Sequence, residues 1–290
     1  MPSLSINNPR LSVIVISYNM ARELPRTLHS LSAGYQLGIA PSDIEIISID
    51  NGSRDAPAAL PPIAELRHLR SNNPRPSPVH AINEGLVMAQ GDLVGVWIDG
   101  ARMASPGVLA GALSAARQYR NPVIVTPNYQ LGTAHHAAQK SAAYSSEVED
   151  ALLGSINWPD DGYRLFDIAT SEMRSPSGPL LESNGIFMRK STWIRLGGYD
   201  EAFDEPGGGY ANPDLLRRAV DLPDTELVKL VDEGTFHQCH GGISTSTEEG
   251  LISLLKQAGV KYRHLRGKPA GMVRQPGIIL KKDKYLPPPS

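Results

Sequence analysis

Three short polar clusters, each at the end of an apolar run, contain side chains suited to binding a ligand. They are Ser17-Tyr18-Asn19, Asp50-Asn51-Gly52 and Asp99-Gly100-Ala101. Ligands of open parallel sheets bind beyond the carboxyl ends of the strands. If the apolar runs are parallel strands, these polar groups from three distant segments meet at one edge. The sequence therefore predicts a ligand site there.

The runs before these clusters are typical of strands buried on both faces, because they are continuous stretches of aliphatic and β-branched residues. The predicted strands are 11–17, 44–49, 64–69, 93–98 and 123–126. Helices are predicted over 21–35, over 79–90 and from Pro106 onward. Strands and helices that alternate in this way predict an α/β fold, with a mostly parallel sheet and helices on both faces.

Beyond residue 130 this pattern changes. Residues 131–179 are polar and weakly periodic, which favours a lid or an insertion. Further along, a helix is predicted to begin near residue 212, and His237 and His240 lie in a glycine-rich loop. Residues 248–257 indicate a closing helix.

Composition excludes several classes of protein. With 41% hydrophobic and 20% charged residues over 290 positions, the chain is typical of a globular protein and not of a disordered one. Its single cysteine, Cys239, excludes a disulfide framework, a four-cysteine zinc site and an iron–sulfur cluster. No GxGxxG follows the first predicted strand and no GxxxxGKS/T occurs, which disfavours dinucleotide and P-loop sites. The apolar runs are too short to span a membrane and residues 1–10 lack a signal-peptide pattern, so we expect a cytoplasmic protein.

Positive charge is concentrated near the end of the chain. Residues 256–284 include nine Lys or Arg and one Asp, in a chain whose net charge is −2. This asymmetry favours an anionic partner, such as a phosphate-bearing ligand, an acidic polymer or the inner face of a membrane, to which the protein would bind peripherally. The alternative is a solvated basic face. Nucleic acid is disfavoured because Tyr262 and Tyr285 are isolated aromatic residues in this segment.

Five motifs, in this order along the chain, resemble those of the GT-A glycosyltransferases of the family-2 type. They are VIVISYN, IDNGSRD, NEGLVMAQGDLVGVWID, GGYDEAF and FHQCHGG, and the resemblance covers about residues 10–245. It implies a GT-A (Rossmann-like) fold and transfer of a sugar from a nucleotide-diphosphate donor to an acceptor hydroxyl. It also implies a division of the chain into a donor-binding half (1–128), an acceptor-side half with a lid-like insertion (129–247), and a helix with a basic tail (248–290).

The resemblance assigns the first two polar clusters to the donor. Ser17, Tyr18 and Asn19 would form a slot for the nucleotide base, and Asp50 would accept a hydrogen bond from a base N–H, as the family's aspartate does for uracil. Asn51 and Arg75 are further donor-binding candidates. The alternatives are purely structural: an Asx turn at 50–53 and a strand-to-helix cap at 17–19.

The third cluster stands where the family has Asp-x-Asp, which holds Mn²⁺ or Mg²⁺ against the donor diphosphate. Here Ala101 follows Asp99, so the second carboxylate is missing. His237 or His240, at the position of the family's late histidine, would complete the metal site, and histidine favours Mn²⁺ over Mg²⁺. Alternatively, Arg102 and the basic tail neutralise the phosphates without a metal, and the histidines only pack.

The acceptor side departs from the family at the catalytic base. Gly198, Tyr199 and Asp200 resemble the segment that lines the acceptor, but the family's acidic pair aligns with Ala211 and Asn212. An amide cannot take a proton, so the family's usual base is absent and Asn212 is an acceptor-side candidate only.

Asp214 is the nearest substitute for the missing base, and Asp204 and Glu205 are more distant candidates. Asp214 can replace Asn212 only if Asn212 caps the helix and Pro213 is its first residue, a position that proline favours. The alternative is that Asp214 only stabilises the helix N-terminus.

These observations predict an inverting glycosyltransferase of bacterial-type glycan or polysaccharide assembly, with UDP as the favoured nucleotide and a glycan or lipid-linked acceptor. Two alternatives remain. One is a non-catalytic nucleotide-sugar-binding protein on the same fold, which Ala101 and Asn212 motivate. The other is an unrelated α/β enzyme such as a nucleotidyltransferase.

Overall fold

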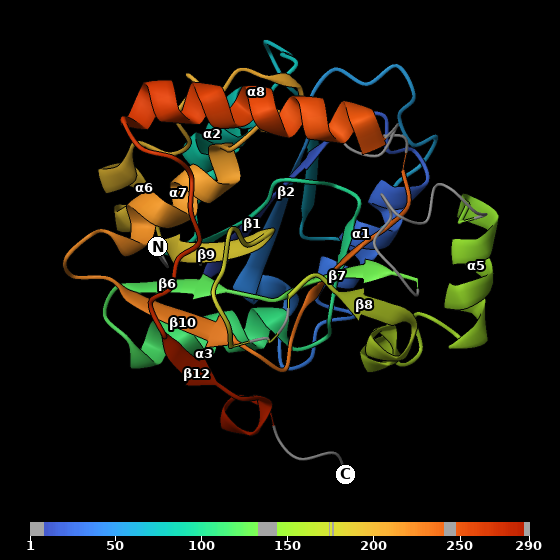
Figure 1. Ribbon diagram of the computed structural model, residues 1–290. Helices are drawn as coiled ribbons and strands as arrows, with labels where there is room; N and C mark the ends of the chain where they lie inside the picture. Colours follow the sequence, from blue (N-terminus) through green and yellow to red (C-terminus); the bar gives the residue numbers. More distant parts are fainter. Residues whose placement is uncertain (1–8, 133–143, 174, 176, 241–247, 287–290) are drawn as a thin grey trace, which may run out of the picture.

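The computed structural model describes residues 9–132, 144–173, 175, 177–240 and 248–286. Within these residues the main sheet has the strand order β12-β10-β6-β9-β4-β1-β2-β3 (Figure 1). Its strands are β1 (Leu11–Ser17), β2 (Ile44–Asp50), β3 (Leu66–Arg70), β4 (Leu93–Trp97), β6 (Pro122–Val125), β9 (Gly185–Arg189), β10 (Glu226–Leu230) and β12 (Ile278–Leu280). The sheet therefore takes strands from all three segments that the sequence analysis expects, 1–128, 129–247 and 248–290.

One strand of this sheet runs against the others. β9 pairs antiparallel with both β4 and β6, whereas the remaining neighbours pair parallel. Gly185, the first residue of β9, is in register with Trp97, the last residue of β4. The residues that precede β9 therefore lie at the same edge as the residues that follow β4. The prediction of a mostly parallel sheet is confirmed, and the reversal of β9 adds a segment to its carboxyl edge.

A second, smaller sheet lies beyond that edge, with the order β5-β11-β7-β8. Its strands are β5 (Arg102–Ala104), β7 (Asn128–Leu131), β8 (Ala169–Ser171) and β11 (Thr235–His237). β5 and β11 pair antiparallel with His237 opposite Arg102. This pairing joins the segment after β4 to a segment far along the chain.

A buried carboxylate anchors the β5–β11 pair. Glu233 is fully buried and accepts hydrogen bonds from the Ser105 hydroxyl, the Gly107 N–H and the hydroxyls of Tyr163 and Tyr285. Burial raises its pKa, although these donors favour the ionised form. One side chain thus fixes the turn before β11 to the start of the segment that follows β5.

Helices cover both faces of the main sheet, as predicted. They are α1 (Glu23–Leu31), α2 (Val79–Met88), α3 (Val108–Gln118), α6 (Lys190–Leu196) and α7 (Ala211–Val220). Two further helices are α5 (Ser146–Ser155), which packs against the second sheet, and α8 (Glu248–Arg266). Short 3₁₀ turns are η1 (Pro41–Asp43), η2 (Gly162–Ile168), η3 (Pro206–Gly208) and η5 (Lys282–Lys284).

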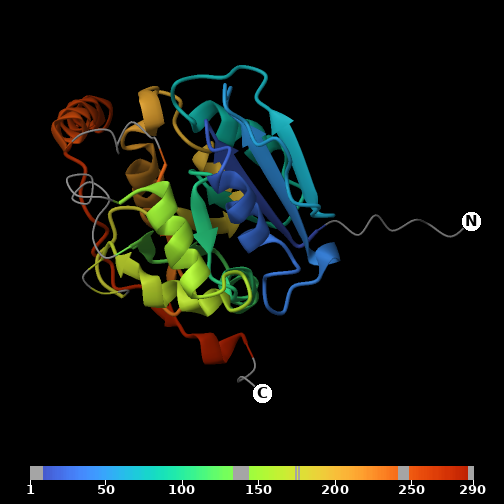
Figure 2. The ribbon, with the colours of Figure 1, turned by 90° about the vertical axis from the view of Figure 1, so that its right-hand side faces the viewer.

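The two faces form separate cores because side chains alternate along each strand. Val13 and Val15 of β1 pack with α1 and α3, whereas Ile14 and Ile16 pack with α2, α6 and α7. α8 lies outside these layers, next to α7 (Figures 1 and 2), and its Tyr262 packs against Phe203. Within the described part of the chain, no helix combines the length and apolar character needed to cross a membrane.

The close approach of β4 and β9 depends on Gly95. A Cβ on this residue would lie 2.5 Å from the Phe187 ring, which is fully buried and meets Trp97 edge to face. We expect Gly95→Ala to lower the free energy of unfolding by about 1–3 kcal/mol, the usual cost of overpacking a core. Urea denaturation measures this change.

Gly154→Ala is the matched control. A Cβ at Gly154, near the end of α5, would meet no atom of the described residues within 4 Å. Alanine is the better helix former, so this variant should gain up to about 1 kcal/mol. Equal stability of the two variants would contradict the packing argument.

Candidate functional site

Asp99, His237 and His240 meet at the carboxyl edge of the main sheet. Asp99 follows β4, His237 ends β11, and His240 lies in the loop after it. Asp99 Oδ2 is 3.1 Å from His237 Nε2 and 3.7 Å from His240 Nε2, and the two imidazole nitrogens are 3.0 Å apart. The structure thus brings together the three residues that the sequence proposed for a metal.

The charges of this cluster suit a divalent cation. Burial opposes ionisation of Asp99, but His240 and His237 lower its pKa well below the usual value. Burial and the nearby Arg102 lower the pKa of His237 to about 4, so its imidazole is neutral at pH 7. Burial disfavours the charged form of His240, but Asp99 raises its pKa. One carboxylate oxygen and two imidazole nitrogens form a donor set that fits Mn²⁺ better than Mg²⁺.

The loop that carries His240 is held from two sides. Gln238 N–H donates to the Ala101 carbonyl at 2.8 Å, next to the polar cluster that follows β4. Cys239 N–H donates to the buried carboxylate of Glu149 on α5 at 2.6 Å, and Glu149 pairs with Arg22 at 3.1 Å. Residues of α5, within the predicted insertion, therefore help to position the histidine.

Arg102 lies beside this cluster, and some of its N–H donors have no hydrogen-bond partner in the described part of the chain. Its side chain is 8% exposed, its Nε is 3.8 Å from Asp99 Oδ2, and one terminal nitrogen is 4.0 Å from Glu172 Oε1. Among the described residues, its Nε and the other terminal nitrogen have no hydrogen-bond partner. Buried polar groups normally find partners, and guanidinium groups bind phosphate oxygens well. Arg102 is therefore suited to an anionic ligand.

Two further carboxylates, to which no motif in the sequence points, lie near Arg102. Glu172 follows β8, and its Oε1 accepts a hydrogen bond from Gln130 at 2.9 Å. Glu182 precedes β9 and is partly exposed. Burial raises the pKa of Glu182, Arg102 lowers it and Glu172 raises it further. A prediction that β9 runs antiparallel would have drawn attention to the residues before it.

Asn212 lies against the segment that precedes β9. It is 5% exposed, and its side-chain amide donates to Ser183 O at 3.1 Å and to Asn184 Oδ1 at 3.2 Å. Its Oδ1 accepts a hydrogen bond from the Tyr199 hydroxyl at 3.0 Å. The structure thus joins Asn212 and Tyr199, two of the proposed acceptor-side residues.

Asp214 lies in a different environment. α7 begins at Ala211, so the expectation that Asn212 caps the helix is wrong. Two helical residues at i and i+2 point about 200° apart. The Asp214 side chain is 1% exposed and accepts hydrogen bonds from Arg218 at 2.7 Å and from Arg266 at 2.6 and 2.9 Å. These bonds tie α7 to α8.

The other acidic candidates on this side also pair with α8. Asp200, which follows Gly198 and Tyr199, pairs with Arg266 at 2.6 Å. Lys261 pairs with both Asp204 and Glu205. Some of the positive charge in the basic tail is therefore used inside the molecule.

The first two polar clusters pack against each other. Asn51 N–H donates to Ser17 O, and Asn19 N–H donates to Ser53 Oγ, each at 2.8 Å. Asp50 accepts from Ser53 N–H, three residues on, at 2.7 Å and pairs with Arg70 at 3.2 Å, so it also has a local structural role, as its alternative reading expects. Its side chain has room for a further hydrogen bond, because a carboxylate offers about four acceptor sites.

Tyr18 and Arg75 present their side chains near these clusters. Tyr18 is 51% exposed, so its ring is open to a planar ligand. Asn51 bonds the backbone of Arg75, whose guanidinium pairs with Glu201 at 3.4 Å. Arg75 therefore faces the acceptor-side segment.

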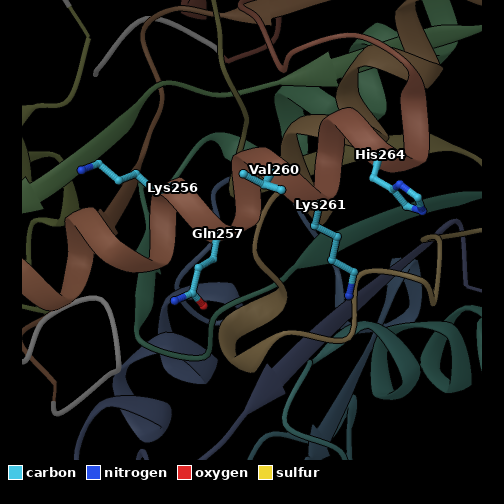
Figure 3. A pocket seen from close by; sticks show the side chains of 5 residues that line it. All are labelled: Lys256, Gln257, Val260, Lys261 and His264. Atoms are coloured by element: carbon cyan, nitrogen blue, oxygen red, sulfur yellow. The ribbon is translucent and has the colours of Figure 1, made fainter.

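A hollow on α8 lies apart from these groups. Lys256, Gln257, Val260, Lys261 and His264 line it, and all five come from α8 (Figure 3). It is an open surface along one helix, without the carboxylate and imidazole groups that gather after β4 and β11.

Comparison with known proteins adds a family and a set of related structures. A family model described as "Glycosyl transferase family 2" matches residues 12–162, which include Asp50, Asp99 and Arg102. No curated protein matches the sequence.

Among solved structures, S. aureus TarS 1–349 in complex with UDP-GlcNAc is 13% identical with a TM-score of 0.52, over 88% of this chain and 66% of that one. Another structure of S. aureus TarS matches with the same identity and TM-score, over 88% of this chain and 40% of that one. The mannosyltransferase PcManGT from Pyrobaculum calidifontis, in complex with GDP-Man and Mn²⁺, is 17% identical with a TM-score of 0.54, over 90% of this chain and 66% of that one. This chain thus spans just under two thirds of the shorter structures, and the likeness establishes a common fold.

The cluster of Asp99, His237 and His240 predicts a measurable metal affinity. Loss of an outer-shell partner weakens metal binding by ~10–100-fold. Asp99→Asn and His240→Ala each remove a direct ligand, so we expect each to weaken Mn²⁺ binding by more than that. Titration of Mn²⁺ followed by electron paramagnetic resonance measures this. His264→Ala, in the α8 hollow, is the control and should bind Mn²⁺ as the parent does. Unchanged affinity in Asp99→Asn would contradict the metal site.

Proposed function

The chain belongs to glycosyl transferase family 2 and has the GT-A fold, and on that basis we propose that it transfers a sugar from a nucleotide-diphosphate donor to an acceptor hydroxyl. The observation that carries the proposal is the group of Asp99, His237 and His240 beside a buried arginine, Arg102, whose Nε and one terminal nitrogen have no hydrogen-bond partner among the residues that the structure describes. A nucleotide-sugar transferase needs such a group where the diphosphate leaves.

Arg102 and the three clustered residues divide the work on the leaving group. Asp99, His237 and His240 would hold a divalent cation, which supplies charge neutralisation for the phosphate oxygens. Arg102 donates N–H groups to the same phosphates and so stabilises the negative charge that develops as the sugar departs. Because Ala101 leaves one carboxylate fewer to hold the cation, Arg102 supplies positive charge to the phosphates directly.

The nucleotide base binds at the first two polar clusters. The exposed ring of Tyr18 covers one face of the base, and Asp50 accepts a hydrogen bond from a base N–H. Asn51 fixes the loop of Arg75, and Ser17 and Asn19 hold the two clusters together. UDP and GDP derivatives are bound in the related solved structures, and we favour a uridine nucleotide for this chain.

The acceptor enters from the side of Asn212 and the segment before β9. Gly198, Tyr199 and Asp200 support this side, because Tyr199 orients Asn212 and Asp200 ties the segment to α8. Attack by one hydroxyl in line with the leaving diphosphate inverts the anomeric carbon. A glycan or a lipid-linked saccharide supplies such a hydroxyl.

Release of nucleoside diphosphate tests the proposal. UDP-GlcNAc, UDP-glucose and GDP-mannose are each incubated with the protein and Mn²⁺, with and without a panel of saccharide acceptors. We expect one donor to be consumed, faster with an acceptor, and its sugar to appear on that acceptor in a mass spectrum. Consumption of nucleoside triphosphate and sugar phosphate in place of these donors would indicate a nucleotidyltransferase.

A second function, nucleotide-sugar binding without turnover, has specific support. Ala101 and Asn212 stand where the resemblance expects carboxylates of the metal site and of the base. Under this alternative a donor raises the melting temperature by mass action, but no sugar is transferred to any acceptor.

The base slot predicts a defined loss of donor affinity. Asp50→Asn replaces one acceptor oxygen with an N–H₂ group that faces the base N–H, which leaves that donor unpaired. The cost is about 1–3 kcal/mol, or roughly 5- to 150-fold in Kd. Calorimetric titration with UDP measures it, and Asp167→Asn, on an exposed ion pair with Arg164, is the control. Parental UDP affinity in Asp50→Asn would refute the slot.

A further inference from the structure

Glycosyl transfer to a hydroxyl requires a group that takes the hydroxyl proton, and Asn212 cannot do so. An amide has no basic lone pair at neutral pH, so the proton must go to a carboxylate or imidazole within hydrogen-bond reach of the acceptor. The question is which described carboxylate at this edge is placed to receive it.

Chain topology puts Glu182 at this edge. It precedes β9, whose first residue, Gly185, is in register with Trp97 at the end of β4. Asp99 follows Trp97 by two residues. Because β9 runs antiparallel, Glu182 approaches the carboxyl edge from the start of a strand, whereas Asp99 approaches it from the end of one.

Direct contacts connect Glu182 to Asn212. The Asn212 amide bonds the two residues that follow Glu182, the carbonyl of Ser183 and the side chain of Asn184. Asn184 in turn donates to Glu182 Oε1 at 3.4 Å. The amides of Asn184 and Asn212 both favour the ionised form of Glu182. Asn212, at the position where the family has an acid, thus orders the segment that carries Glu182.

The charged groups that face Glu182 suit a base. Burial and the neighbouring Glu172 raise its pKa, while Arg102 and the two amides act in the opposite direction. A carboxylate with a raised pKa is a stronger proton acceptor than an exposed one, which suits general base catalysis. Arg102 Nε also lies 3.8 Å from Asp99 Oδ2, so Arg102 links the phosphate end of the site to the carboxylate of Glu182.

The competing carboxylates are committed to other partners. Both oxygens of Asp214 accept charged hydrogen bonds, from Arg218 and Arg266. Asp200 Oδ2 bonds Arg266 and its Oδ1 bonds the N–H of Ala202. Glu182, in contrast, is partly exposed and holds a long hydrogen bond from a neutral amide.

We propose that Glu182 is the general base of the reaction, an inference that rests on the proposed glycosyl transfer. The acceptor oxygen forms a bond to the anomeric carbon as the bond from that carbon to the diphosphate oxygen breaks. The nucleoside diphosphate leaves with that electron pair. The acceptor proton passes to the carboxylate of Glu182, which later releases it to water.

The central experiment compares turnover of Glu182→Gln with that of the parent. Turnover is measured as nucleoside diphosphate released from UDP-GlcNAc, UDP-glucose or GDP-mannose in the presence of Mn²⁺ and saccharide acceptors. We expect kcat to fall by roughly 10²–10⁴-fold, the usual effect of losing a general base, with UDP affinity unchanged. Glu182→Asp, which keeps a carboxylate, should retain part of the activity. Glu147→Gln, exposed at the start of α5, is the matched control and should behave as the parent.

The pH profile separates a base from a merely structural residue. A base must be ionised, so parental turnover should rise with pH through the raised pKa of Glu182, and Glu182→Gln should lose this acidic limb. Circular dichroism verifies that each variant is folded, and Glu182→Asp carries the test if the glutamine variant is not.

The possible outcomes decide between the candidates. Near-parental kcat and an unchanged acidic limb in Glu182→Gln would overturn the proposal and leave the transferase function standing. Loss of the limb in Glu172→Gln or Asp214→Asn, and not in Glu182→Gln, would assign the base to that residue instead. Absence of turnover in the parent, although it binds UDP, would refute the proposed function itself, and the role of Glu182 would fall with it.

Discussion

The antiparallel pairing of β5 with β11 is the contact on which the site depends. It places His237 opposite Arg102, so residues that follow β4 meet residues that lie far along the chain. The buried Glu233 reinforces the pairing, because its carboxylate binds Ser105 and Gly107 just beyond β5. Without this pairing, Asp99 would be an isolated carboxylate at a strand end. With it, Asp99 gains two imidazole neighbours and a guanidinium.

The sequence was sufficient to predict the parts of the site that follow parallel strands. Ser17, Asp50 and Asp99 were identified because continuous apolar runs mark buried strands and because parallel strands end at one edge. The reversal of β9 could not be predicted in the same way. An apolar run such as 185–189 indicates a buried strand but carries no signal for its direction. The sequence pattern therefore does not predict that the residues before it, Glu182 among them, lie at the site.

The start of α7 shows a second limit of sequence-based prediction. Proline is tolerated throughout the first turn of a helix, because the first four N–H groups have no intrahelical partner. Pro213 could therefore be the first helical residue or the third, and the structure has it third. This difference of one half-turn decides which way Asp214 points. Its burial against two arginines of α7 and α8 depends on α8, which is distant in the sequence.

The hydrogen bonds of Asn212 have an evolutionary consequence. An aspartate at this position would lose the N–H donors to Ser183 O and Asn184 Oδ1, and it would bring another negative charge toward Glu182 and Glu172. Like charges in a partly buried site disfavour each other's ionisation. The amide at 212 and the acid at 182 are therefore compatible as a pair, whereas two acids are not. An aspartate at 212 is therefore favourable only if the acid at 182 is also changed, so the two positions are coupled.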